Sequence, residues 1–384
     1  MKKPLIMLLF ILLVALSCSV NANSRTIIFP HACAPGDHLL IASVGDVLLH
    51  KSLQMKANEY GYLRLWAQAI PVIKKADIAF ANVEGPMAHN IDVAGREVLN
   101  ADDRINHRVY TSYPLFNYNP NLAEALKETG FNVVSTANNH ALDRESVGVD
   151  RTIEALKHIG LHYSGTVLKG ASTPWYTIIR RKGFSIAWIA CTAGTNGRED
   201  HHNQVLYCYK RKDRRLIKNL VTQLKTQVDA IIITPHWGVQ YQHTPDIKQK
   251  QFAKEMLDAG ALAIIGSHPH VLQPMQKYMT QDGRSTFIAY SLGNFVSYQG
   301  TPKNRSTVIL YLGLTRLSDH KTIINGIRFI LAYMQNRSGL EKIRLQLLTP
   351  KSRGAVGYQI IANILPMGNA IAPDDPIVTN PRCY

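Results

Sequence analysis

The amino-acid sequence predicts an α/β protein in which short buried strands alternate with helices. Three observations predict this class. Apolar runs of strand length recur along the first 300 residues, segments with apolar residues at helical spacing lie between them, and several of these helical segments stop at a glycine. The chain has 384 residues and is 46% hydrophobic, so it also has ample material for a large core. Elements that alternate in this way form a sheet layered with helices.

The first expected elements follow one another closely. Residues 39–49 form an apolar run with a turn, which predicts a strand and then a loop. Residues 62–76 have helical spacing, and residues 77–85 predict a short buried strand that ends at a glycine. Residues 119–130 start with Asn-Pro, carry apolar residues at helical spacing and stop at a glycine, which predicts a helix. Residues 131–140 predict another strand followed by a loop.

The same alternation continues through the middle of the chain. Residues 148–160 predict a helix that ends in glycine, and residues 185–191 predict a strand. Residues 214–227 again have helical spacing. Residues 228–238 predict a strand and a loop, and residues 246–260 predict a helix. This order is typical of strands that are connected through helices.

The series closes with a strand and loop at 261–271 and an apolar segment at 285–296. The rhythm then changes to segments that we expect to be strands added at one edge: 307–314, 324–334 and 343–349. An irregular, proline-rich tail follows. We therefore expect one main domain over residues 38–300 and a C-terminal extension over 301–384, with a long polar loop at 90–113.

The first 22 residues predict a secretory signal peptide. "MKK" precedes an apolar run of about a dozen residues and then small residues, which is the order of such a signal, with cleavage after Ala22. The run is too short for a comfortable membrane span. Two alternatives stay open, namely lipidation of Cys18, as in a bacterial lipoprotein, and a retained signal anchor. We expect an exported protein that is located in the periplasm or the cell envelope.

Cleavage after Ala22 leaves four cysteines, which allow three pairings in an oxidising compartment. We expect Cys191 and Cys208 to form a staple across a loop. We expect Cys33 and Cys383 to join the two ends of the chain. The alternative is four free, buried thiols.

The net charge favours an anionic partner. The chain carries +16, and removal of Lys2 and Lys3 with the leader leaves 16 − 2 = +14. This charge favours a polyanion, a phosphorylated substrate or an acidic membrane surface. Nucleic acid is not expected, because the basic residues are scattered and the chain is exported. The one dense run, 210–215, is interpreted as the solvated start of a helix.

Polar residues of metal-binding type follow five of the expected strands. In α/β sheets the loops at the carboxyl ends of the strands converge, so such residues meet in one place. Each of them alone also fits a turn, a helix cap or a solvated loop. Their combination favours a shared metal site, and the residues are Asp46, Asn82, Glu84, Asn138, Asn139, His140, His236, His268 and His270.

The segment "SHPH" holds two histidines two residues apart, His268 and His270. In an extended segment such residues project from the same side and can clamp a metal. Carboxylate, amide and imidazole ligands suit Mn, Fe, Zn or Mg rather than a thiolate site. Two ions about 3.5–4 Å apart can polarise a scissile group and activate a water. A nearby histidine that is not a ligand can then protonate the leaving group.

Six segments resemble the signature blocks of the CapA family, the poly-γ-glutamate capsule synthesis proteins. The segments are "GDVLLH", "NVEGP", "ANNHALD", "HWGVQY", "IIGSHPHVLQP" and "YSLGNF", and they lie in the family's order between residues 45 and 295. The resemblance implies a calcineurin-like metallophosphoesterase fold, in which a β-sandwich of two sheets is flanked by helices. It refines the plain α/β prediction.

The resemblance also implies roles for individual residues. It implies that His140 protonates the leaving group and that Asp143 orients His140. It implies one or two divalent ions held by Asp46 as the carboxylate of the first metal, Glu84 as the bridging carboxylate, Asn139, His236 at the second metal, and His268 and His270, one for each metal.

The chain departs from the pattern of the phosphoesterases and of the family in three places. Phosphoesterases carry a histidine two residues after the first aspartate, where this chain has Leu48. His50 follows two residues later and is left open as a substitute. Gln240 stands where the family usually has glutamate, and Leu262 where it usually has aspartate. These departures leave open a site with a single metal, or no turnover.

Two functions follow as hypotheses. The first is an exported, metal-dependent hydrolase that acts on an anionic substrate, either a γ-glutamyl polymer or a phosphoester, in capsule or cell-envelope metabolism. The second is a non-catalytic factor that binds a polyanion or organises a capsule synthesis complex for assembly or export. Leu48 and Gln240 favour the second.

Overall fold

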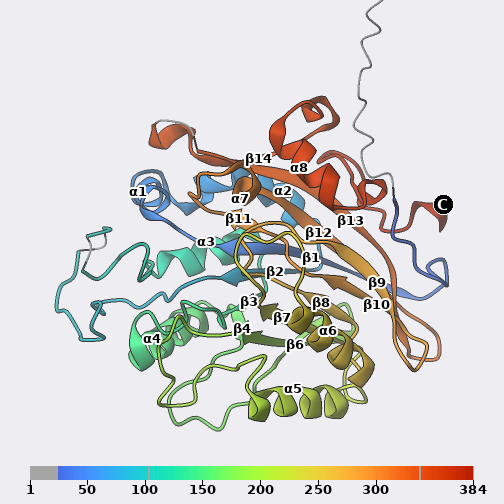
Figure 1. The fold of residues 1–384 in the computed structure, drawn as a ribbon, viewed down its shortest axis with the longest axis horizontal. Helices are drawn as coiled ribbons and strands as arrows, with labels where there is room; N and C mark the ends of the chain where they lie inside the picture. The colour runs from blue at the N-terminus through green and yellow to red at the C-terminus, as the bar shows by residue number, and fades with distance from the viewer. Residues whose placement is uncertain (1–24, 103, 107, 337–338, 384) are drawn as a thin grey trace, which may run out of the picture.

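Two β-sheets pack against each other at the centre of the molecule (Figure 1). The computed structural model describes residues 25–102, 104–106, 108–336 and 339–383. The strands of the first sheet are β1 (Asp37–Val47), β2 (Ile78–Val83), β3 (Val133–Ser135), β4 (His162–Ser164), β11 (Asn294–Val296), β12 (Ser306–Arg316), β13 (Thr322–Gln335) and β14 (Arg344–Leu347). The strands of the second are β5 (Thr177–Arg181), β6 (Phe184–Thr192), β7 (Ala230–His236), β8 (Ala263–Ile265), β9 (Met275–Met279) and β10 (Ser285–Ala289).

Each sheet has a parallel centre. In the first sheet the order is β14-β13-β12-β1-β2-β3-β4, with β11 also paired to β1; the steps from β1 to β4 are parallel and those from β1 to β14 antiparallel. In the second the order is β5-β6-β7-β8-β10-β9, parallel except at its two edges. The carboxyl ends of β1, β2 and β3 therefore lie along one edge, and those of β6, β7 and β8 along another.

Helices cover the outer face of each sheet, as Figure 1 shows. The first sheet packs against α1, α2 and α3, and the second against α5 and α6. The apolar faces of both sheets meet between them, where the rings of Phe80 and Trp188 stack with their centroids 5.0 Å apart. The helices are α1 (Lys51–Tyr60), α2 (Ile70–Ile73), α3 (Asn121–Thr129), α4 (Glu145–His158), α5 (Arg211–Leu224), α6 (Ile247–Ala259), α7 (Pro302–Arg305) and α8 (Val356–Ile364).

The β-sandwich flanked by helices confirms the fold class that the resemblance implies. The alternation of strands and helices alone predicted one sheet layered with helices, whereas the structure has two sheets. The predicted helix at 62–76 is also broken into the 3₁₀ turns Tyr62–Leu65 and Ala67–Ala69 and the short α2. It breaks at Trp66, whose backbone is not helical (φ −137°, ψ 29°).

The C-terminal strands lie at one edge of the first sheet, as predicted. β12 pairs with β1 from Asp37 opposite Arg316 to Ser43 opposite Leu310, and β13 and β14 follow outward. The division of the chain into a main domain and an extension after residue 300 stays a prediction. The signal peptide and Cys18 lie outside the described residues. Within the described part of the chain, no helix is long and apolar enough to cross a membrane.

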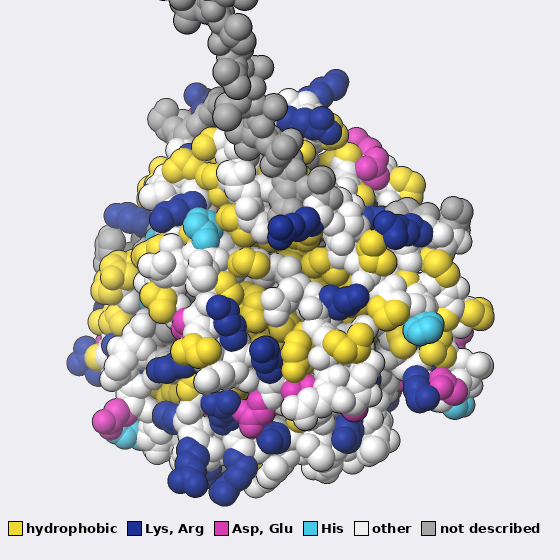
Figure 2. Space-filling view, turned by 45° about the vertical axis from the view of Figure 1, so that its right-hand side comes forward, with side chains coloured by type: hydrophobic (Ala, Val, Ile, Leu, Met, Phe, Trp, Pro, Cys, Tyr) yellow, Lys and Arg dark blue, Asp and Glu magenta, His cyan; other side chains and the backbone are white. Residues whose placement is uncertain are grey.

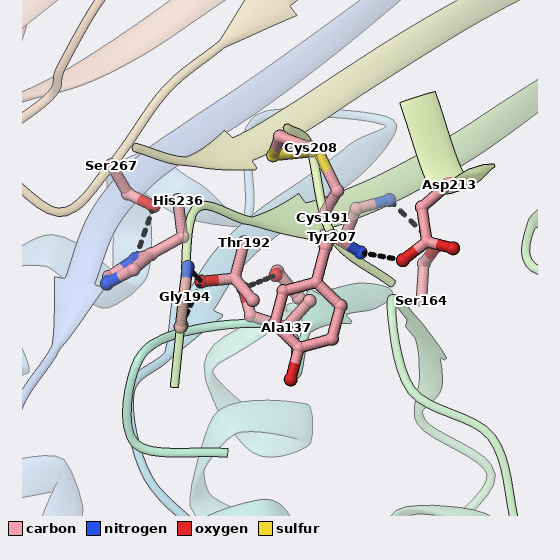
Figure 3. The surroundings of a disulfide bond; sticks show 12 residues. Ala137, Ser164, Cys191, Thr192, Gly194, Tyr207, Cys208, Asp213, His236 and Ser267 are labelled. Carbon is pink, nitrogen blue, oxygen red and sulfur yellow. Dashed lines mark hydrogen bonds between the residues drawn. A yellow bond between two sulfur atoms is a disulfide. The ribbon is translucent and has the colours of Figure 1, made fainter. Parts of the chain in front are cut away.

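Both expected disulfides are present. Cys33 pairs with Cys383 across 350 residues, and Cys191 pairs with Cys208 across 17. Figure 3 shows the second bond, which joins the end of β6 to the segment that leads into α5. Cys191 and Cys208 are both fully buried. These pairings are compatible with an oxidising compartment.

Replacing Cys191 and Cys208 together with alanine should lower the free energy of unfolding by about 3 kcal/mol, because the closed loop restricts the unfolded chain. Alanine leaves no buried hydroxyl in the apolar surroundings of the bond. Urea unfolding of the double variant and of the wild-type protein measures the difference. The exposed Thr222→Ala on α5 serves as the control. A loss no larger than that of this control would contradict the prediction.

Candidate metal centre

Residues from the carboxyl ends of both sheets meet at one place. Asp46 is the last but one residue of β1, Glu84 directly follows β2, and His236 is the last residue of β7. The other predicted residues follow the ends of β3 and β8: Asn139, His140, His268 and His270. The structure thus brings together all six residues that the sequence predicts as metal ligands.

Three of these residues form a first group of ligand atoms. One ligand atom each of Glu84, His236 and His268 lies within 4.8 Å of the others. The Nδ1 atom of His268 is 3.0 Å from Nε2 of His236. Asn139 belongs beside this group, because its Oδ1 atom is 2.7 Å from the same Nε2 atom of His236.

A second group consists of Asp46, Glu84 and His270, again with ligand atoms within 4.8 Å of one another. His270 Nδ1 lies 3.4 Å from Asp46 Oδ2, and His270 Nε2 lies 3.7 Å from Glu84 Oε1. Glu84 is therefore common to both groups. This geometry is compatible with a carboxylate that bridges two ions, although the ligand roles themselves stay predictions.

The predicted strand and loop are both present, since β8 ends at Ile265 and the backbone around His268 and His270 is a turn rather than an extended segment. His268 has φ 97° and His270 has φ 58°, both in the left-handed region that is unfavourable for residues other than glycine. Gly266 precedes them where a Cβ atom would lie 2.2 Å from the carbonyl oxygen of Tyr290. The turn directs His268 toward the first group and His270 toward the second.

Burial and neighbouring charges compete in setting the pKa values of the centre. It raises the pKa of the Glu84 carboxyl to about 8 and lowers the pKa of His236 to about 3. Burial also acts to lower the pKa of His270, but the nearby Glu84 and Asp46 carboxylates outweigh it and raise that pKa to about 9. For Asp46, burial acts to raise the pKa, and the hydrogen bond with His270 and the charge of His236 hold it below its usual value.

The donor set fits a divalent cation. Both oxygens of Glu84 are buried and have no hydrogen-bond donor among the residues that the structure describes. A buried carboxylate without such a partner is costly unless a cation satisfies it. The surrounding carboxylate, amide and imidazole groups are ligands for Mn, Fe, Zn or Mg. Glu84, Asp46, Asn139 and the three histidines would hold such ions.

His140 and Asp143 lie beside the two groups and contact each other. Nδ1 of His140 is 2.7 Å from Oδ2 of Asp143, which also accepts a hydrogen bond from the backbone N–H of Phe116. The rings of His140 and Phe116 pack edge to face, with their centroids 4.8 Å apart. The carboxylate therefore fixes the orientation of the imidazole, as the resemblance implies. The catalytic roles of both residues stay predictions.

The residues at which the chain departs from the phosphoesterase and family patterns belong to neither group of ligand atoms found among the described residues. Leu48 is buried, and Leu262 packs in the core between the sheets. Burial lowers the pKa of His50 to about 4, and its Nδ1 atom lies 3.2 Å from the backbone N–H of Tyr298. Gln240 is exposed. Whether His50 substitutes as a ligand stays an open prediction.

Four polar residues support the predicted ligands; Asn82 was among the strand-end residues expected at the site, whereas Ser267, Asn294 and Asn196 were not expected from the sequence. Asn82 donates to Asp46 Oδ1 at 2.8 Å, and Ser267 Oγ lies 3.0 Å from Nδ1 of His236 (Figure 3). Asn294 Oδ1 lies 2.9 Å from Nδ1 of His270. Asn196 accepts from Asn139 at 3.1 Å. The first three lie in or beside the quoted blocks, whereas Asn196 lies in a loop without a recognisable pattern.

The fold and the centre define an α/β sandwich protein with a carboxylate- and histidine-rich candidate metal site. The model of the family described as "Bacterial capsule synthesis protein PGA_cap" matches residues 40–299. The chain belongs to this family.

Individual relatives agree with this assignment. The "Capsule biosynthesis protein CapA" of Bacillus anthracis is 29% identical over 296 residues, which are 73% of this chain and 66% of that protein. The "PGA biosynthesis protein CapA" of Bacillus subtilis is 27% identical over 283 residues, which are 73% of this chain and 69% of that protein. The match covers slightly less than two thirds of the Bacillus anthracis protein. The activities and partners of these whole proteins can therefore only be proposed for this chain.

Among solved structures, the NAD nucleotidase of Haemophilus influenzae is similar with a TM-score of 0.45 and 13% identity. The similarity covers 91% of this chain and 66% of that chain. A likeness of this degree carries no argument about function.

Proposed function

We propose that the protein is a metal-dependent hydrolase that acts on an anionic substrate, either a γ-glutamyl polymer or a phosphoester, in capsule or cell-envelope polymer metabolism. The observation that carries the proposal is the pair of ligand groups that share Glu84. A shared carboxylate between two sets of imidazole and carboxylate donors suits two divalent ions that act on one substrate group.

In this proposal, different residues bind the ions and transfer the proton. When bound, divalent ions supply Lewis-acid polarisation of the scissile group and of a water. Asp46, Glu84, Asn139 and the three histidines would hold these ions. His140 donates a proton to the leaving group through Nε2, because its Nδ1 atom is engaged by Asp143. Phe116 packs on the His140 ring and limits its movement.

Three features support an anionic substrate in a cell envelope. The net charge is +16 for the full chain and 16 − 2 = +14 without the predicted leader, and Figure 2 shows Lys and Arg side chains distributed over the face that it draws. Such a charge raises the local concentration of an anionic substrate. The relatives from the two Bacillus species are named for capsule and PGA biosynthesis. The predicted leader and the two disulfides support export.

A second candidate is a non-catalytic factor for capsule assembly or export that binds a polyanion in the same place. Leu48 supports it, because this buried side chain stands where phosphoesterases have a ligand histidine. The exposed Gln240 supports it as well, since the family usually has glutamate there. This candidate keeps the ions and the anionic partner but does not include bond cleavage.

Metal analysis combined with a substrate panel distinguishes the two candidates. We expect the purified protein to contain up to two divalent ions per chain and to hydrolyse phosphoesters or γ-glutamyl chains. Chelation should abolish the hydrolysis and lower the free energy of unfolding, by about 2.7 kcal/mol relative to metal at 100 times its dissociation constant. Re-addition of Mn²⁺ should restore both. Stoichiometric metal without turnover would favour the assembly factor, and a protein that binds no metal would contradict both.

A further inference from the structure

A loop between β6 and α5 reaches the candidate metal centre. Residues 193–206 leave the end of β6 and return beside it, where Thr192 N–H donates to the carbonyl of Leu206 at 2.9 Å. The Cys191–Cys208 disulfide closes the base of the loop (Figure 3). The neighbouring backbone N–H of Ala193 donates to the carbonyl of His236 at 2.8 Å. The base of the loop is thus fixed directly beside one of the predicted ligands.

The tip of the loop carries Asn196, which contacts a second predicted ligand. The Oδ1 atom of Asn196 accepts a hydrogen bond from Nδ2 of Asn139 at 3.1 Å. With its amino group engaged on this side, Asn139 directs its Oδ1 atom toward Nε2 of His236, at 2.7 Å. The reverse orientation of the Asn139 amide would turn N–H donors toward the ligand atoms, where a cation needs a lone pair.

Asn196 also lies close to His140, but this contact does not explain its position. Nδ2 of Asn196 is 3.5 Å from Nδ1 of His140. That ring nitrogen donates its proton to Asp143 at 2.7 Å, so it has no lone pair to offer to Asn196. The hydrogen bond of Asn196 with Asn139 is therefore the contact that has a chemical consequence at the centre.

The loop holds Asn196 in place through contacts of its own. Thr195 Oγ donates to the carbonyl of Arg198 at 2.6 Å, and the N–H of Arg198 donates to the carbonyl of Thr195 at 2.9 Å. Arg198 forms an ion pair with Glu145 at the start of α4. Asn196 itself has φ 52°, a backbone conformation that asparagine tolerates better than most residues. These contacts within the loop and to α4 therefore fix the position of Asn196.

We propose that Asn196 is a positioning residue that orients the amide of Asn139 so that its oxygen faces the ion held by His236 and His268. The inference rests on the metal centre of the proposed function and adds a residue from outside the strand ends to it. The Cys191–Cys208 disulfide and the Arg198–Glu145 ion pair contribute to this positioning, because they fix the loop that carries Asn196.

The test uses glycine substitutions, since Asn196 and Asn203 lie in the same exposed loop and both have φ 52°. Glycine removes the side chain without backbone strain at either position. Mn²⁺ is titrated by calorimetry into the full-length, chelator-treated protein. We expect Asn196→Gly to weaken binding at one of two sites by about 10–100-fold and Asn203→Gly to leave it unchanged. Asn196→Asp should bind Mn²⁺ as the wild type does, because the aspartate carboxylate can accept the same hydrogen bond from Nδ2 of Asn139.

The outcomes separate the inference from the function on which it rests. Wild-type Mn²⁺ affinity in Asn196→Gly would overturn the positioning role while leaving the metal centre intact. Equal weakening in Asn203→Gly would overturn it too, because the effect would then belong to the loop as a whole. Weakened Mn²⁺ binding in Asn196→Asp would contradict the hydrogen bond as the cause. A wild-type protein that binds no Mn²⁺ would overturn the proposed centre and the inference together.

Discussion

Glu84→Gln is expected to abolish divalent metal binding in both halves of the candidate centre. Glu84 is the one carboxylate that the two ligand groups share, so its loss removes a ligand from each. Even the loss of a residue that only supports a metal ligand costs about 10–100-fold in affinity, and we expect more than about 100-fold here. Metal content after purification and Mn²⁺ titration measure the effect.

The metal-free Glu84→Gln protein should be at least as stable as the metal-free wild type. Burial disfavours the charged carboxylate and raises its pKa to about 8, whereas glutamine has the same shape and no charge. Unfolding by urea in the presence of a chelator tests this. The exposed Glu128→Gln on α3 is the matched control and should retain its metal. A Glu84→Gln protein with full metal content would rule out the shared ligand.

His140→Ala is expected to lower metal-dependent hydrolysis by about 10²–10⁴-fold while the protein keeps its fold and its metal. His140 lies outside both ligand groups, and its Nδ1 atom is held by Asp143 at 2.7 Å. Under the proposed function it transfers a proton and does not bind an ion. The measurement is kcat on the substrate that the panel identifies, with metal content determined on the same sample.

Two further variants make the role of His140 specific. Asp143→Asn should lower kcat less than His140→Ala, because the imidazole remains but loses the acceptor that orients it. His158→Ala, at an exposed position on α4, should leave kcat unchanged. Unchanged turnover in His140→Ala would refute its role as the acid. Loss of metal in that variant would instead make His140 part of the ion site.

The sequence predicted which residues would lie together because of a rule about strands. Asp46, Glu84 and His236 lie at or just after the ends of buried parallel strands, and such ends converge whatever the distance along the chain. The rule works here across two sheets, although the alternation of elements predicted one. Which sheet a strand joins depends on the packing of apolar faces such as those of Phe80 and Trp188, which periodicity does not encode.

Other features of the centre could not be predicted from local patterns. The turn that separates His268 from His270 has a left-handed backbone at two histidines, which residue preferences do not anticipate. Asn196 is brought to Asn139 by a loop that a disulfide and an ion pair hold in place. Both depend on contacts between segments that are distant in the sequence, so only the folded structure reveals them.

The Cys33–Cys383 disulfide affects where the folded protein first opens. It ties the approach to β1 to the last described segment, and Asn369 adds hydrogen bonds to the backbone N–H and carbonyl of Ile27 at 2.7 and 3.1 Å. The ends of a chain are normally where fraying starts. Here they brace each other at the approach to β1, so we expect the earliest opening of the described chain in interior loops rather than at these segments.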